Sequence, residues 1–103
     1  MPRRILLNTK YGGFSLSKRA KQMYLELTKD IERPQHWFIN QDVRRDDPIL
    51  LNVIDTLGLE ESAGEYTRLA ITEIPDDIPA DGWIICEYDG MEWVAEKHRT
   101  WHA

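Results

Sequence analysis

Hydrophobic side chains recur at helical spacing in the first third of the chain. Between Leu16 and Ile31 they fall three and four residues apart, with charged residues at the positions between them, which is the pattern of an amphipathic helix. Ser17 is the expected N-cap, because a serine hydroxyl can accept a hydrogen bond from a free amide of the first turn. The side chains expected to face the core are Leu16, Ala20, Met23, Tyr24, Leu27 and Ile31.

A second helix is marked at both ends. Asp47 can cap it, Pro48 fits its first position, and Gly58 fits the position after its end, where glycine readily adopts the left-handed conformation. Its apolar stripe consists of Leu50, Val53, Ile54 and Leu57.

Two segments flanking this second helix are expected to be irregular. Residues 34–45 precede it, with Trp37, Phe38 and Ile39 as core anchors. Residues 60–65 follow it as an acidic loop.

Short runs rich in β-branched and aromatic residues predict four strands, at residues 5–8, 67–74, 83–88 and 91–96. Asp89-Gly90 separates the last two runs, and this pair favours a type I′ turn because both positions need a positive φ. The order strand, helix, helix and three strands predicts a single α+β domain over residues 1–103. We expect a small antiparallel or mixed sheet of about four strands, with two helices packed on one face and a C-terminal β-hairpin.

A two-residue turn also fixes the register of the hairpin. It pairs Tyr88 with Met91, Cys86 with Trp93 and Ile84 with Ala95 on the face expected to be buried. The opposite face pairs Glu87 with Glu92, Ile85 with Val94 and Trp83 with Glu96, and His98 continues it.

Like charges directly opposite each other are mildly destabilising, so the acidic face is not explained by folding. It indicates a docking surface for a basic partner, a solvated sheet face or, less specifically, a divalent-metal site. The spacing is not that of a metal-ligand signature, and we expect no metal. The candidate partner-binding residues are Glu87, Glu92, Glu96 and His98.

The composition narrows the class of protein. Of the 103 residues 30% are charged, and the formal net charge is −5, which disfavours nucleic-acid binding over a broad surface. The single cysteine, Cys86, allows no intramolecular disulfide. No apolar run approaches the length of a membrane span, so we expect a cytoplasmic protein with no membrane partner.

A glycine-containing loop between the first strand and the first helix is a candidate anion site. Backbone amides there could hold an anion near a helix start, and arginines could bind phosphate as forks. The segment lacks the Gly-Lys-Ser/Thr ending of a P-loop; a tight turn, and arginines paired with nearby aspartates, are the alternatives. The candidate ligand-binding residues are Lys10, Tyr11, Gly12, Gly13, Phe14, Ser15, Ser17, Arg44 and Arg45.

No catalytic constellation can be assembled from the sequence. Cys86 lies at a position expected to be inward, and His36, His98 and His102 are scattered. We therefore expect no enzyme activity and no cofactor.

Several motifs resemble a family of small uncharacterised proteins of bacteriophages and prophages. They are Tyr11-Gly12-Gly13-Phe14 with Leu16-Ser17, Arg45 with Asp47-Pro48, Leu57-Gly58, Glu73-Ile74-Pro75-Asp76-Asp77, Tyr88-Asp89-Gly90, and Glu96-Lys97-His98-Arg99 with Trp101. The resemblance implies a viral accessory protein made in a bacterial cytoplasm, and it supplies no activity, cofactor or catalytic residue. Small phage proteins of this kind often bind a host protein or sequester a nucleotide signal used in host defence.

Two functions follow as hypotheses. The first is a non-catalytic accessory protein that binds a host or phage protein. The alternative is a small-ligand binder that sequesters an anionic, nucleotide-type molecule. The oligomeric state stays open, and a homo-oligomer is compatible with either hypothesis.

Overall fold

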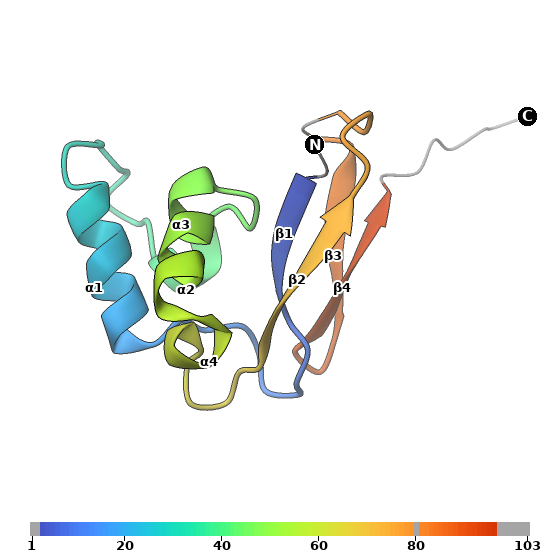
Figure 1. Ribbon diagram of the computed structural model, residues 1–103, viewed down its shortest axis with the longest axis horizontal. Coiled ribbons are helices and arrows are strands. Elements are labelled where there is room, and N and C mark those ends of the chain that lie inside the picture. Colours follow the sequence, from blue (N-terminus) through green and yellow to red (C-terminus); the bar gives the residue numbers. More distant parts are fainter. Residues whose placement is uncertain (1–2, 80, 97–103) are drawn as a thin grey trace, which may run out of the picture.

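Residues 3–79 and 81–96, which the computed structural model describes, fold into four helices and four strands (Figure 1). The α+β class and the C-terminal hairpin expected from the sequence are confirmed. No helix within these ranges is long and apolar enough to cross a membrane. In chain order the elements are β1 (Arg3–Asn8), α1 (Lys18–Leu27), α2 (Ile39–Asp42), α3 (Pro48–Leu57), α4 (Leu59–Ser62), β2 (Leu69–Ile74), β3 (Trp83–Tyr88) and β4 (Met91–Glu96).

The four strands form two separate antiparallel pairs, β1 with β2 and β3 with β4, and not the single sheet that we expected. Other groups close the edge of β1 that faces away from β2. The Leu6 amide donates to the Arg45 carbonyl at 2.8 Å, and the Asn8 amide donates to the Glu92 carboxylate at 2.8 Å. Since a loop carbonyl and a side chain already satisfy these donors, none of the described strands pairs with β1 there.

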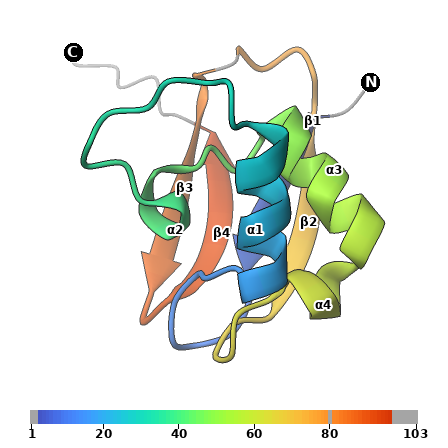
Figure 2. The ribbon, with the colours of Figure 1, turned by 90° about the vertical axis from the view of Figure 1, so that its left-hand side faces the viewer.

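β1 lies in the middle of the molecule. Figure 1 shows the helices on one side of the β1–β2 pair and the β3–β4 hairpin on its other side, and Figure 2 shows the same strands behind the helices. Successive side chains of a strand point to opposite faces, and β1 is buried on both: Leu6 joins the helix-side cluster, while Ile5 and Leu7 are buried facing the other way.

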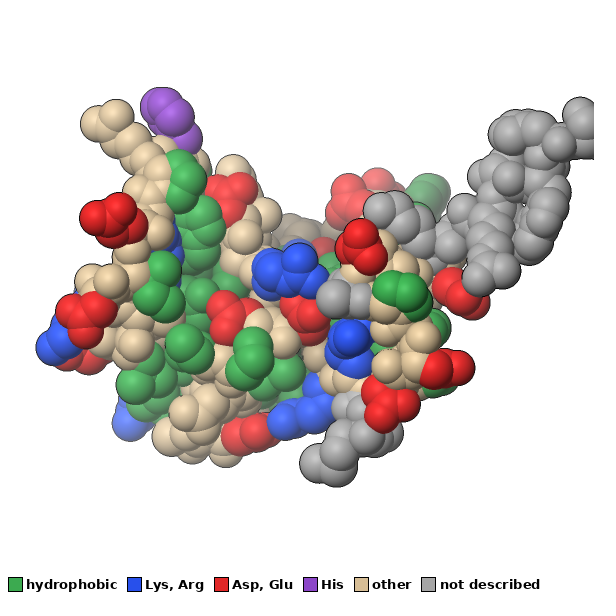
Figure 3. All heavy atoms as spheres, turned by 90° about the horizontal axis from the view of Figure 1, so that it is seen from above, with side chains coloured by type: hydrophobic (Ala, Val, Ile, Leu, Met, Phe, Trp, Pro, Cys, Tyr) green, Lys and Arg blue, Asp and Glu red, His purple; other side chains and the backbone are tan. Residues whose placement is uncertain are grey.

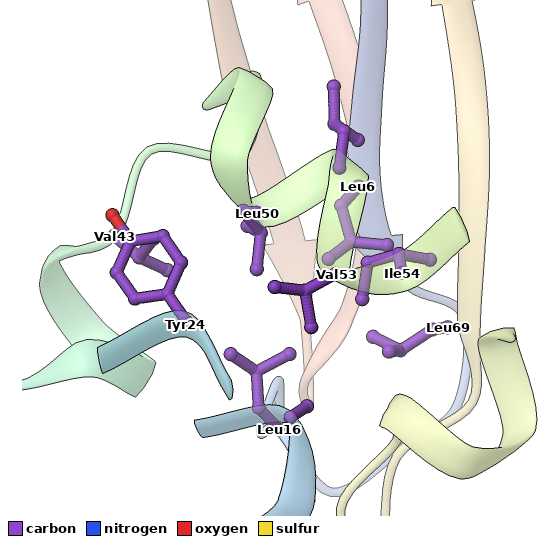
Figure 4. Close-up of a cluster of buried hydrophobic side chains, with 10 residues drawn as sticks. Leu6, Leu16, Tyr24, Val43, Leu50, Val53, Ile54 and Leu69 are labelled. Atoms are coloured by element: carbon purple, nitrogen blue, oxygen red, sulfur yellow. The ribbon is translucent and has the colours of Figure 1, made fainter. Parts of the chain in front are cut away.

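The main core is built around α3. Its Leu50, Val53 and Ile54 lie between side chains of the α1 region and those of the strands (Figure 4). Each of the three is at most 1% exposed, so each contributes roughly 1.5–3 kcal/mol through burial of apolar surface. The cluster is completed by Leu6, Leu16, Ala20, Tyr24, Val43, Leu51 and Leu69.

The expected ends of α3 are confirmed, and those of α1 are confirmed only at its start. Asp47 caps α3 with Pro48 in the first turn, and Gly58 follows its end with a φ of +89°. The Ser17 hydroxyl caps α1 by accepting a hydrogen bond from Ala20. However, α1 ends at Leu27, because the backbone of its C-cap Thr28 leaves the helical conformation, with a φ of −115° and a ψ of 19°.

The early end of α1 exposes residues that the periodicity assigned to the core. Leu27 is 51% exposed and Ile31 is 53% exposed. The connecting segments are also more ordered than expected, since α2 lies within residues 34–45 and α4 occupies part of the acidic loop. Phe38, an expected core anchor, is 61% exposed because it precedes α2 on the surface, whereas Trp37 and Ile39 do pack against the core.

Candidate functional site

The loop between β1 and α1 is held against the turn of the β3–β4 hairpin. The Gly12 amide donates to the Asp89 carbonyl at 3.0 Å. A Cβ atom on Gly90 would lie 2.2 Å from the backbone nitrogen of Gly13, so only glycine permits this approach. Gly12 and Gly13 also have positive φ values of +124° and +99°. These glycines therefore allow the loop after β1 to contact the β3–β4 turn, which lies far from it in the sequence.

Most amides of this loop are already engaged. Lys10 donates to the side chain of Asn8, Ser15 to the hydroxyl of Thr67, and Leu16 to the side chain of Asn40, at 3.2, 3.0 and 3.0 Å. The Ser17 amide donates to the Ser62 carbonyl at 2.8 Å. An anion cradle needs amides that point into solvent, so this geometry gives the anion hypothesis little support.

Arg45 and Glu92, which the sequence assigned to two different sites, form one buried ion pair. The guanidinium donates two bonds to the carboxylate, at 2.6 and 2.9 Å, and one to the Leu6 carbonyl at 3.3 Å. It also stacks on the Phe14 ring, 3.5 Å from its centroid. The two side chains are only 14% and 8% exposed, so neither is available to a ligand or partner. Their role is to join β4 to β1 and to the segment before α3.

Arg44 lies on the surface and is also paired. Its Nε donates to Asp46 at 2.9 Å and its Nη2 to the same carboxylate at 3.2 Å, and this hydrogen bonding raises the pKa of Arg44. The guanidinium lies 5.9 Å from the centre of the Trp83 ring. The structure thus places Arg44 beside β3 and turns Arg45 inward to Glu92.

A cleft of about 640 Å³ near the start of α3 gathers three arginines and three aspartates. Arg4 forms a forked pair with Asp55 at 2.9 and 2.6 Å, which lowers the pKa of Asp55, and Arg3 donates to the carbonyls of Ile78 and Pro79. With the arginines engaged in this way, the cleft is not a strongly positive site.

The register of the β3–β4 hairpin is as expected, but the burial of Glu92 and Trp93 is the reverse of what we expected. All six cross-strand pairs match the sequence expectation, and Asp89 and Gly90 have φ values of +51° and +92°. Glu92, expected on the exposed face, is buried, whereas Trp93, expected in the core, is 48% exposed. Arg45 holds the Glu92 carboxylate inward through two hydrogen bonds.

The outward face of the hairpin is therefore apolar. It carries Tyr88, 66% exposed, and Ile84, 40% exposed, beside Trp93, and Cys86 is partly exposed among them. A contiguous exposed apolar patch is a common mark of an interaction site. We call this surface the outer hairpin face; it consists of Ile84, Cys86, Tyr88, Met91, Trp93 and Ala95.

The segment that contains the outer hairpin face is rich in acidic residues. Residues 69–96 contain no lysine, arginine or histidine. Figure 3 shows Asp and Glu side chains beside apolar ones at the end of the molecule where the strands lie, together with some Lys or Arg side chains. Glu87, Asp89 and Glu96 form no ion pair within the described ranges. The eight acidic residues of the stretch are Glu73, Asp76, Asp77, Asp81, Glu87, Asp89, Glu92 and Glu96.

The other candidate residues do not come together as a site. Glu87 and Glu96 stay exposed while Glu92 turns inward, and His98 lies outside the described residues. Within residues 3–79 and 81–96 no three histidine, cysteine, aspartate or glutamate side chains are placed to hold a metal ion. Sequence reasoning missed the outer hairpin face, although the run of 28 residues without a basic side chain was a usable signal.

Comparisons with protein-family models, with curated proteins and with solved structures found no match for this chain.

Proposed function

We propose that this protein is a non-catalytic binding protein that uses the outer hairpin face to dock a basic region of another protein. The observation that carries this proposal is an exposed apolar sheet face, including Tyr88 and Trp93, set in a stretch without basic residues. Aromatic side chains are enriched at the energetic centres of protein interfaces. Unneutralised carboxylates at the rim favour a partner of opposite charge.

The same charges argue against a second copy of this chain as the partner. A symmetric dimer through the outer hairpin face would bring two acidic rims together, and juxtaposed like charges disfavour association. The resemblance to phage proteins makes a host or phage protein the proposed partner. The alternative, an anionic small molecule at the glycine loop, has weaker support because the amides and arginines of that site are engaged internally.

A capture experiment with matched variants tests this function. The full chain is immobilised and exposed to bacterial lysate, and Trp93→Ser is compared with Leu27→Ser, since the two native side chains are 48% and 51% exposed. Leu27 is on α1, at the opposite end of the molecule (Figure 1).

We expect a specific protein that is retained by the native chain and by Leu27→Ser but lost with Trp93→Ser. Its retention should also fall when salt is raised from about 150 to about 500 mM. Equal retention by Trp93→Ser, or no specific protein at all, contradicts the proposed function.

A further inference from the structure

The edge of β3 that faces away from β4 has unpaired backbone groups. The pair Tyr88–Met91 flanks the two-residue turn, so it is hydrogen-bonded, and bonded pairs alternate along an antiparallel ladder. The amides and carbonyls of Ile85 and Glu87 consequently point away from β4. Within residues 3–79 and 81–96 these groups bond to no other element.

A groove of about 510 Å³ follows this edge. One wall is formed by Asp81, Trp83, Ile84 and Ile85, and the other by Gln41, Val43, Arg44 and Arg45. Both arginines are already paired with carboxylates, Arg44 with Asp46 and Arg45 with Glu92. The wall includes residues from both faces of β3 and none from β4. The groove therefore runs along the unpaired edge and not beneath the hairpin.

Trp83 supplies a second, independent sign that something is to be bound here. Its indole N–H is buried and has no hydrogen-bond acceptor within the described ranges. An unpaired buried donor is unfavourable, and Trp83 is one of the residues that line the groove.

β3 also lacks the features that keep edge strands from pairing. Its six residues include no proline, glycine or lysine, and Glu87 is its single charged residue. An exposed edge of this kind is a template for another strand.

We propose that β3 binds an extended segment of a basic protein as an added strand. This inference rests on the proposed function and specifies how the partner is recognised. Main-chain hydrogen bonds to Ile85 and Glu87 would hold the segment, as in other strand-addition complexes. The apolar side chains of the bound segment would fill the groove beside Val43 and Trp83. Its lysines or arginines would pair with Glu87. The acidic stretch 69–96 disfavours the edge of a second copy as occupant.

Peptide selection followed by backbone methylation tests the mode of binding. Short random peptides displayed on phage are selected against the full chain, and the enriched sequences are synthesised. We expect them to be basic and rich in β-branched residues.

Each peptide is then N-methylated at every second residue, in two complementary series. An added strand bonds to β3 through alternate amides, so one series should weaken binding about ten-fold or more while the other changes it little. Ile85→Pro, which removes an outward amide, should also weaken binding.

The outcomes separate the two proposals. Equal effects of the two series overturn strand addition. If the two series have equal effects but the peptides do not bind Trp93→Ser, docking on the outer hairpin face is kept and only strand addition to β3 is rejected. If the two series have equal effects and Trp93→Ser does not weaken peptide binding, both proposals fail. A selection that enriches acidic peptides or none, or a dimer of the chain that Ile85→Pro dissociates, likewise contradicts a basic added strand.

Discussion

At the scale of single residues, the Arg45–Glu92 pair decides which face of the hairpin is buried. Glu92 accepts two bonds from Arg45 and one from the Asn8 amide, so the carboxylate is compensated in spite of its burial. Breaking a buried pair by removing one partner leaves an uncompensated charge. Glu87, directly opposite Glu92 in the hairpin, is exposed and unpaired within the described residues.

These two neighbouring glutamates give a matched test of the ion pair. We expect Glu92→Ala to lower the free energy of unfolding by about 3 kcal/mol or more. Glu87→Ala should change it by less than about 0.5 kcal/mol, as is usual for surface positions. Denaturant unfolding measures both. Equal effects of the two substitutions would show that the faces are assigned wrongly.

Tyr24 links the core to the N-cap of α3, and it makes the free energy of unfolding depend on pH. Burial, aided by the hydrogen bond from its hydroxyl to Asp47 at 2.5 Å, raises the pKa of Tyr24. A pKa raised in the folded state stabilises the fold below the unfolded value near 10, and this stabilisation is lost as the pH rises further. Between pH 8 and pH 11 the free energy of unfolding should fall less for Tyr24→Phe than for the native chain.

The control for this pH dependence is Tyr66→Phe, because Tyr66 is 65% exposed. The control should behave as the native chain does. If Tyr24→Phe loses as much stability between the two pH values as the control, the buried phenol is not the cause.

At the scale of elements, the sequence predicts well wherever the signal is local. The ends of α3 and the register of the hairpin follow from Asp47, Gly58 and Asp89-Gly90, whose conformational preferences act on adjacent residues. The faces of the hairpin could not be predicted, because both carry apolar side chains and the choice depends on Arg45, 47 residues from Glu92. The separation of the two sheets depends on the same distant contacts at β1.

The contribution of the N-cap of α3 to stability can be tested by substituting Asp47. Asp47 bonds to the Ile49 amide at 2.8 Å and also accepts from Tyr24. Asp47→Ala should therefore cost about 2 kcal/mol, roughly twice the value of a cap alone. Asp47→Ser can restore the cap but is too short for Tyr24, so about half the loss should return. If Asp47→Ser is as unstable as Asp47→Ala, the cap is not a separate contribution.

The glycines of the loop and the turn give another test. Gly90 and Gly58 have nearly equal φ values, +92° and +89°, but a Cβ would meet the Gly13 backbone only at Gly90. Both alanine substitutions strain the backbone, by roughly 1–3 kcal/mol. Gly90→Ala should cost clearly more in thermal unfolding, since the loop must also move. Equal melting temperatures would contradict the close approach.

At the scale of the whole molecule, charge and apolar surface divide between two ends. The helical end holds the main core, and the hairpin end combines the outer hairpin face with residues 69–96, which carry eight acidic and no basic side chains. This division could have been read from the sequence as a charge asymmetry. The exposure of Tyr88 and Trp93 could not, because it follows from the inward turn of Glu92.

Binding through the outer hairpin face can be tested by the rate at which a maleimide labels Cys86, the only cysteine of the chain. We expect the maleimide to label Cys86 in the native chain without denaturant, because Cys86 lies on the outer hairpin face. Labelling should slow about ten-fold or more when the captured partner is bound, while Leu27→Cys in a Cys86→Ser background keeps its rate. Labelling that requires unfolding, or that proceeds equally fast in the complex, would show that the outer hairpin face is not the binding surface.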